Sequence, residues 1–131
     1  MDIIEIRTRA KEEFVDLTTE AGRVVAGSGV ASGVCVVTAP HTTAGVTVNE
    51  NADPDVRADL LTTLRRIVPD ALPYSHAEGN SPAHAKAALV GSSVSLIVEG
   101  GRLKLGTWQG VFFCEFDGPR TRKVWIQIVG K

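Results

Sequence analysis

The chain has 131 residues, of which 44% are hydrophobic and 22% charged, a composition typical of one ordinary globular domain. Its 14 basic and 15 acidic residues leave a formal net charge of -1, so nothing favours nucleic acid or an anionic membrane, and any anion site must be local. No apolar run approaches the roughly 20 residues of a membrane span, and the first residues lack the pattern of a secretory signal, so we expect a cytoplasmic protein.

The first half of the chain predicts strands on both sides of one short helix. Alternating or β-branched apolar runs mark strands at residues 3–9, 14–17, 33–39 and 45–49. Thr18 or Thr19 can cap a helix that continues to about Ala26, where the GSG at 27–29 ends it. The third strand, GVCVVTA, is apolar at nearly every position, which predicts burial on both faces until Pro40 ends it.

Two further helices are predicted from one shared start signal. Asp53-Pro54 combines an N-cap residue with proline at the first helical position, and Ser81-Pro82 repeats this combination. Pro69 ends the first of these helices, and Gly91 ends the second. The first helix carries an apolar stripe at helical spacing, formed by Val56, Leu60, Leu61, Leu64 and Ile67.

The last third of the chain predicts strands joined by tight turns. These strands are expected at residues 93–98, 103–105, 108–116 and 123–129. Gly100-Gly101 and Gly118-Pro119 supply turns between them. We therefore expect one α+β domain over residues 1–131, with a mostly antiparallel sheet or sandwich and two or three helices.

The two cysteines, Cys35 and Cys114, lie inside apolar runs. Such positions favour buried, reduced thiols, whereas a disulfide would need an oxidising compartment. The cysteines do not form a CxxC pair, and the chain has neither a glycine-rich phosphate loop nor a GxSxG elbow.

All three histidines lie in polar stretches near turns or helix starts, at His41, His76 and His84. His84 falls in the first turn of the helix that begins at Ser81-Pro82, where the helix dipole disfavours the imidazolium. A neutral imidazole is the form that binds metal. The spacing of His76 and His84 matches no standard zinc motif, so a surface or hydrogen-bonded role is the alternative.

A second polar group follows the strand at residues 45–49. Asp53 is expected to cap the next helix, and the neighbouring Asn49 and Asn51 can bond backbone groups of the turn. Glu50 is harder to assign to a structural role, because it comes directly after a buried strand. A carboxylate in that place is either paired or reactive.

The third polar group lies in LGTWQGVFFCEFDGPRTR. Glu115 and Asp117 are two residues apart and share one strand face, and Arg120 and Arg122 follow a turn. The arginines can form a solvated salt-bridge patch or can hold phosphate with two-pronged geometry. Trp108 can be a substrate contact or simply a core residue.

Five stretches, in this order, resemble the YjbQ-like family, which is also labelled secondary thiamine-phosphate synthase. They are HTTAGVTVNENADPDVRADL, HAEGN, AHAKAALVG, GGRLKLGTWQGV and EFDGPRTR. The resemblance extends from about Phe14 to the C-terminus. It implies a compact α+β fold with a curved antiparallel sheet and a homotrimer with polar pockets near subunit boundaries. It also implies a thiamine-phosphate synthase activity, which joins a pyrimidine pyrophosphate to a thiazole phosphate.

The family's polar signature maps onto positions that the residue patterns had already marked. The matching residues are His41, Thr42, Asn49, Glu50, Asp53, His76, Glu78, His84, Trp108, Gln109, Glu115, Asp117 and Arg122. We expect His41, Asn49, Glu50, His76 and His84 to converge on one pocket, either within one chain or across a subunit boundary.

The first functional hypothesis is a small-molecule enzyme with a histidine-lined pocket that acts on a phosphorylated substrate. A divalent metal such as zinc would be bound by His41, His76 and His84. The expected catalytic residues are Asn49, Glu50 and Glu115, with one of the two glutamates moving a proton. The substrate and its phosphate would be bound by Thr42, Trp108, Gln109, Arg120 and Arg122.

The second hypothesis is a non-catalytic, trimeric protein that binds a metal or a metabolite. An enzyme site should leave one metal coordination position open, whereas a structural site should be closed by four protein ligands. Enzymes of pyrophosphate chemistry usually carry magnesium bound by aspartates. The chain has no paired-aspartate motif, so a synthase activity could be incidental to its main function.

Overall fold

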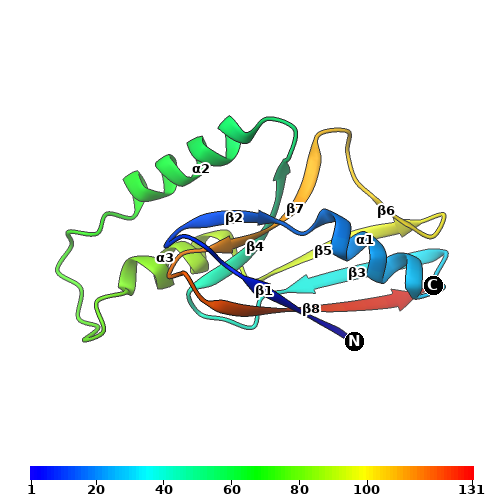
Figure 1. Cartoon of the computed structure of the whole chain (residues 1–131), viewed down its shortest axis with the longest axis horizontal. Helices are drawn as coiled ribbons and strands as arrows, with labels where there is room; N and C mark the ends of the chain where they lie inside the picture. The colour runs from blue at the N-terminus through cyan, green and yellow to red at the C-terminus, as the bar shows by residue number, and fades with distance from the viewer.

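Five strands form one antiparallel sheet in the computed structural model, which describes residues 1–131 (Figure 1). In spatial order they are β1 (Asp2–Arg7), β8 (Thr121–Gly130), β3 (Ser32–Thr38), β5 (Ser93–Glu99) and β6 (Arg102–Lys104). A second antiparallel sheet has the spatial order β2 (Glu13–Asp16), β7 (Gln109–Glu115) and β4 (Ala44–Glu50). The helices are α1 (Thr18–Gly27), α2 (Pro54–Ile67) and α3 (Ser81–Val90). The predicted α+β class with mostly antiparallel strands and three helices is confirmed.

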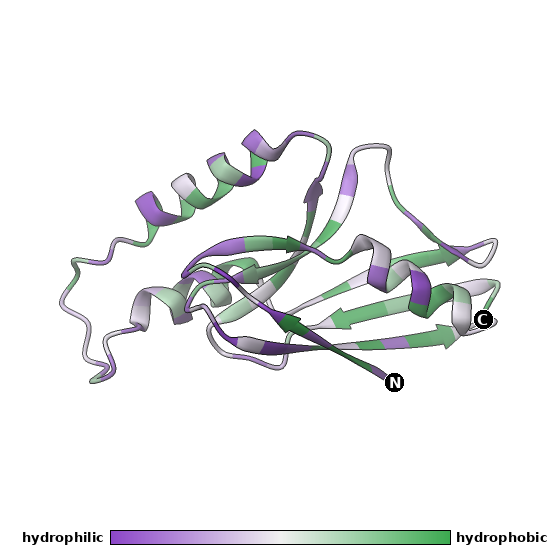
Figure 2. Ribbon diagram, viewed as in Figure 1, coloured by the Kyte–Doolittle hydropathy of each residue, from purple (hydrophilic) through white to green (hydrophobic).

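The main hydrophobic core lies between the two sheets, and α1 closes one end of it. Alternate residues of each strand point inward, such as Cys35 and Val37 of β3 and Val124 and Ile126 of β8. Such alternation is expected where a sheet has one face against the core and one face outward. Hydropathy does not follow this alternation in β3, which is hydrophobic along most of its length in Figure 2.

A smaller core covers the other face of the three-stranded sheet. Phe112 and Cys114 of β7 pack there with Ala83 and Ala87 of α3, and the apolar stripe of α2 lies against the same cluster. The strand β7 is therefore buried on both faces, because its other side faces the main core.

The prediction that residues 33–39 are buried on both faces is wrong. Cys35 and Val37 are buried, but Val34 is 40% exposed on the outer face of the five-stranded sheet. The strand is apolar on both faces, as its composition indicates, but only one of these faces is buried in the core and the other points outward.

The Asp53-Pro54 helix start is confirmed. Asp53 is the N-cap of α2, and its Oδ1 accepts a hydrogen bond of 2.9 Å from the backbone N–H of Asp55. The helix α3 is present and ends before Gly91 as predicted, but it begins one residue earlier than predicted, because Asn80 is its N-cap and Ser81 is already helical. Strand ends differ from the predicted ones by one or two residues, which is the usual scatter at element boundaries.

Both cysteines are buried and neither forms a disulfide, as predicted. None of the three helices has the length and the apolar character needed to cross a membrane.

Candidate functional site

A cavity of about 700 Å³ opens where β3 ends, β8 begins and α3 starts. We call it the histidine pocket, because all three histidines line it together with Arg120 and Arg122. The remaining lining residues are Ala39, Pro40, Thr42, Thr43, Glu78, Asn80 and Ser92. The predicted meeting of the histidines and the arginines at one place is therefore present within a single chain.

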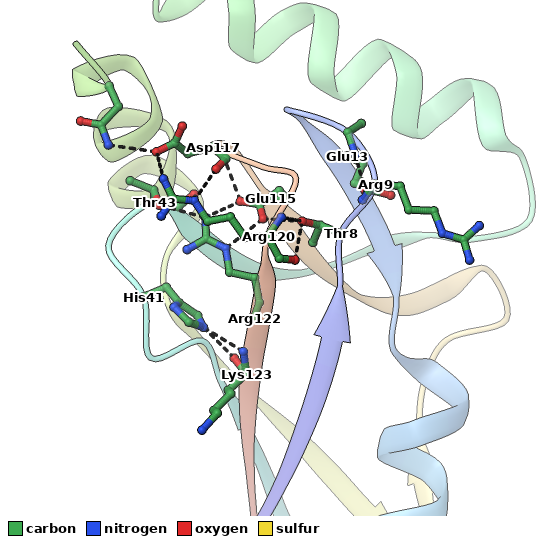
Figure 3. A network of polar contacts seen from close by, with 12 residues as sticks. Thr8, Arg9, Glu13, His41, Thr43, Glu115, Asp117, Arg120, Arg122 and Lys123 are labelled. Atoms are coloured by element: carbon green, nitrogen blue, oxygen red, sulfur yellow. Dashed lines mark hydrogen bonds and ion pairs between the residues drawn. The ribbon is translucent and has the colours of Figure 1, made fainter. Parts of the chain in front are cut away.

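His41 enters the pocket on the short turn between β3 and β4, which Pro40 begins. Its ring packs edge-on against Phe113, with 6.2 Å between ring centroids. Its Nε2 lies 3.0 Å from the backbone N and 3.1 Å from the backbone O of Lys123 (Figure 3). In the tautomer that donates to the carbonyl, the Nδ1 lone pair stays free for a ligand.

His76 and His84 approach each other at the start of α3. Their ring centroids are 5.5 Å apart and the rings are almost perpendicular. Two imidazoles on one zinc ion, with Zn–N bonds of about 2.0–2.1 Å, place their ring centres on the order of 5 Å apart. This pair therefore has the spacing of two ligands of one ion. Nevertheless, no group of three or more histidine, cysteine, aspartate or glutamate side chains comes together as a metal site within the chain.

Arg122 is held by a buried ion pair at the inner wall of the pocket. Its Nε donates to Glu115 Oε1 at 2.8 Å, and its Nη2 donates to Glu115 Oε2. The same Nη2 donates to Thr43 Oγ1 at 2.9 Å. The Glu115 carboxylate also accepts hydrogen bonds from Thr8 Oγ1 at 2.8 Å and from the backbone N–H of Asp117 at 3.1 Å. Figure 3 shows this carboxylate at the centre of the polar network.

Arg120 is held differently, because 52% of its side chain is exposed. Its Nε donates to the backbone O of Asp117 at 2.6 Å, and its Nη2 donates to Asp117 Oδ2 at 2.8 Å. Asn80 Nδ2 donates to the same Oδ2 at 2.9 Å. These contacts join the loop before β8 to the residue that precedes α3.

Two pKa shifts follow from these surroundings. Burial alone would raise the pKa of Glu115, but hydrogen bonds from Arg122, from the Asp117 N–H and from Thr8 outweigh burial and lower it. The pKa of His41 is lowered by burial and then by the nearby charge of Arg122. The pocket is therefore lined by an imidazole that is neutral at neutral pH, whereas the ionised, fully paired Glu115 lies behind the pocket wall and, contrary to the prediction, does not line it.

Asn49, Glu50, Trp108 and Gln109 do not line the histidine pocket. They lie at the opposite end of the β4–β7 pair, where Glu50 is opposite Gln109. Seven residues of β4 separate the two ends, which is about 20 Å at the rise of a strand. Within one chain, the structure therefore does not bring these four residues together with the histidines.

The side chains at that far end make local contacts. Gln109 Oε1 accepts a hydrogen bond from Gly106 N at 2.8 Å, and Asn49 Oδ1 accepts one from Glu50 N at 2.7 Å. Trp108 is 63% exposed, so the alternative that it is a core residue is wrong.

Sequence reasoning missed four polar residues of the region. Thr43 and Asn80 line the pocket, and Thr8 lies behind it. Lys86 is buried in α3, with its Nζ 2.5 Å from Glu12 Oε2, and opens on a neighbouring cavity of about 330 Å³. The charged Lys86 within the alanine-rich stretch AHAKAALV could have indicated a buried, paired lysine. No feature of the sequence around Thr8 indicates that it contacts the site.

Family comparison gives a match over nearly the whole chain. The model of a family described as "UPF0047 protein YjbQ-like" matches residues 2–131. The chain is 48% identical over 128 residues to the UPF0047 protein YugU of Bacillus subtilis, and the match covers 97% of each chain. It is 47% identical over 126 residues to a UPF0047 protein of Methanocaldococcus jannaschii, covering 96% of this chain and 91% of the relative.

Solved structures show the same fold. A YjbQ/UPF0047 family protein of Clostridium acetobutylicum superposes with a TM-score of 0.97 at 51% identity, covering 98% of this chain and 100% of the other. A YbjQ-like protein of Sulfolobus solfataricus superposes with a TM-score of 0.95 at 32% identity, covering 99% of this chain and 96% of the other. The arrangement of two sheets and three helices is therefore shared with crystallised relatives.

Proposed function

The chain belongs to the UPF0047 protein YjbQ-like family, and from that premise we propose that it is an enzyme that acts on a phosphorylated small molecule in the histidine pocket. One observation carries the proposal. Three imidazoles and two guanidinium groups, from separate parts of the chain, line a single cavity of about 700 Å³. Such a set can bind an anion and move a proton in the same place.

The anion would be bound by the arginines. Nε and Nη2 of Arg122 are occupied by Glu115 and Thr43, but Nη1 makes no hydrogen bond within the chain. The ion pair thus fixes the guanidinium plane and leaves one N–H edge for a ligand oxygen. Arg120, which is half exposed beside it, supplies a second charge for a phosphate.

Proton movement would fall to His41 only in the pocket without a bound metal, because a metal-bound imidazole has no lone pair left to accept a proton. Its lowered pKa keeps it neutral, so it can accept a proton from a bound substrate at neutral pH. Glu115 is less suited to that task than predicted, because its carboxylate is ionised and occupied by Arg122, Thr8 and the Asp117 N–H.

We also propose a divalent metal, zinc by donor type, bound by His76 and His84 with His41 as the third ligand. The 5.5 Å between the rings of His76 and His84 supports their part. His41 can take part only in the tautomer whose Nε2–H donates to the Lys123 carbonyl, because acceptance of the Lys123 N–H by Nε2 would put the proton on Nδ1. When bound, such an ion would act as a Lewis acid on a phosphate or carbonyl oxygen.

The finer form of the proposal is a thiamine-phosphate synthase-like transferase. The reaction would join a pyrimidine pyrophosphate to a thiazole phosphate and release pyrophosphate. In this scheme the thiazole nitrogen would form the new C–N bond at the pyrimidine methylene as the C–O bond to pyrophosphate breaks, and the arginines would bind the phosphate groups of substrate and leaving group.

The test is a comparison of His41→Ala, His76→Ala and His84→Ala with the native chain. Metal content after dialysis against zinc, and turnover of phosphorylated substrates including the synthase pair, would be measured for each. We expect all three variants to lose bound metal and turnover. Native metal content in all three variants, with the fold unchanged, would rule out the metal site.

A homotrimer is also proposed. It is supported by exposed apolar side chains on the outer face of the five-stranded sheet, namely Ile3, Val34, Ile97, Trp125 and Val129. Such a face is commonly covered by another protein surface. The alternative function, a non-catalytic trimer that binds a metal or a metabolite, shares this face. Metal or phosphate binding without any turnover would favour it.

A further inference from the structure

Thr8 lies directly after β1 and is buried behind the histidine pocket without lining it. Its Oγ1 donates to Glu115 Oε1 at 2.8 Å and accepts a hydrogen bond of 2.8 Å from the backbone N–H of Arg120. Its own backbone N–H donates to the backbone O of Arg120 at 2.9 Å. One residue thus contacts Arg120 at two backbone atoms and contacts the carboxylate that holds Arg122.

The Thr8 hydroxyl acts both as a hydrogen-bond donor and as an acceptor. Its single hydrogen has two acceptors within reach, Glu115 Oε1 at 2.8 Å and the backbone O of Arg120 at 3.0 Å, and the ionised carboxylate is the stronger of the two. A lone pair is then available for the N–H of Arg120. Neither contact can be replaced by an apolar side chain of the same shape, so the hydroxyl connects the orientation of Arg122 to the position of Arg120.

We propose that Thr8 is a positioning residue for anion binding, which holds Arg120 and Arg122 in one mutual arrangement. The inference rests on the proposed function, since it assumes that these arginines bind phosphate. It assigns to the N-terminal strand a part in the site, although Thr8 is more than 100 residues from both arginines in the sequence.

Thr18 provides a matched control. Its Oγ1 accepts a hydrogen bond of 3.0 Å from the backbone N–H of Val111 and donates to Asp16 Oδ1 at 2.6 Å. The hydroxyl therefore makes the same kinds of contact as that of Thr8, but at the start of α1 and outside the pocket. A general loss of stability should affect both variants alike, whereas a loss of positioning should affect Thr8 alone.

The experiment is a calorimetric or ³¹P NMR titration of the full chain with inorganic phosphate at pH 7. We expect Thr8→Val to weaken phosphate binding about tenfold, Thr8→Ser to stay within about twofold of the native chain, and Thr18→Val to bind normally. Native affinity in Thr8→Val, or a loss that Thr8→Ser shares, would overturn the role of Thr8 alone. Absence of phosphate binding by the native chain would overturn the proposed function and this role with it.

A second measurement uses the native chain and does not depend on the folding of a variant. The backbone amide of Thr8 donates to Arg120 O, so its NMR chemical shift should move on saturation with phosphate. The amide of Thr18 should not move. An unchanged Thr8 amide in a chain that binds phosphate would overturn the inference.

Discussion

Glu115 is the residue on which the geometry of the candidate site depends. Its side chain is fully buried, and all of its partners belong to other parts of the network: Arg122, Thr8 and the backbone of Asp117. A buried carboxylate is tolerated only where such partners offset its loss of hydration. Removing one partner is therefore more costly than exchanging both for apolar groups of similar shape.

Glu115→Gln should lower the free energy of unfolding by about 3–5 kcal/mol at pH 7, because Arg122 is left buried without its counter-charge. The folded-state pKa of Glu115 lies below its unfolded value, so its contribution is present above the ordinary carboxyl pKa of about 4.3 and is lost as the pH falls through the folded pKa. Urea unfolding at pH 7 and at steps below pH 5 would check both effects.

Glu99→Gln serves as the control for that experiment. Glu99 pairs with Lys104 on the surface, and both side chains are mostly exposed. Its removal should leave the unfolding free energy nearly unchanged. Equal losses in the two variants would contradict the role of burial at Glu115.

The sequence indicates the acidic partners of the two arginines, but it does not indicate Thr8. The sequence placed Glu115 and Asp117 on one strand face near Arg120 and Arg122, and the structure pairs each acid with one arginine. Thr8 could not be found in this way, because its contact depends on how β1 meets β8 at the far end of the chain.

At the scale of elements, helix starts were predictable and strand environments were not. Asp53-Pro54 and Ser81-Pro82 carry their structure locally, so α2 begins where expected and α3 begins within one residue of the expected start. Thr18 or Thr19 was expected to cap α1, yet the N-cap is Leu17 and the Thr18 hydroxyl bonds β7 instead. The number of covered faces of a strand depends on its neighbours, which explains the error at β3.

The helices α2 and α3 are connected through Glu12, which lies just before β2. Its carboxylate pairs with Lys86 of α3 at 2.5 Å and with Arg65 of α2 at 2.6 Å. Lys86 is almost fully buried, whereas Arg65 is half exposed. This connection matters for the site, because the segment between the two helices carries His76.

Glu12→Gln should lower the unfolding free energy by about 3 kcal/mol, because Lys86 is left as an unpaired buried charge. The double variant Glu12→Gln with Lys86→Met should recover part of that loss. Denaturant titrations of both variants, with Arg65→Gln as the exposed-partner control, would check this. A double variant less stable than Glu12→Gln would contradict the explanation.

At the scale of the whole molecule, the five-stranded sheet has one face in the core and one apolar face outward. Val34 lies opposite Ile97 on one side and Val129 on the other, and Ile3 lies opposite Trp125. All five side chains are at least 40% exposed in the single chain. This face, rather than composition or net charge, is the physical basis for expecting an assembly.

Ile97→Lys should shift the protein from the proposed trimer to a monomer, because it places a charge on the apolar face beside Val34. Native mass spectrometry or light scattering after gel filtration would measure this. Leu72→Lys, which changes an equally exposed apolar residue in the segment after α2, should keep the native mass. A native chain that is already monomeric would contradict the trimer proposal.

Each sheet contains one buried thiol, Cys35 in β3 and Cys114 in β7. Burial raises the pKa of the Cys35 thiol to about 11 and raises that of Cys114 further, so neither reacts readily with an alkylating reagent while it is covered. Cys35 lies in the core between the two sheets and Cys114 in the smaller core under α3, so site-resolved labelling rates in dilute denaturant report the opening of each core separately. Equal rates would indicate that both cores open in one cooperative event, and faster labelling of Cys114 would indicate that α3 leaves the three-stranded sheet before the two sheets separate.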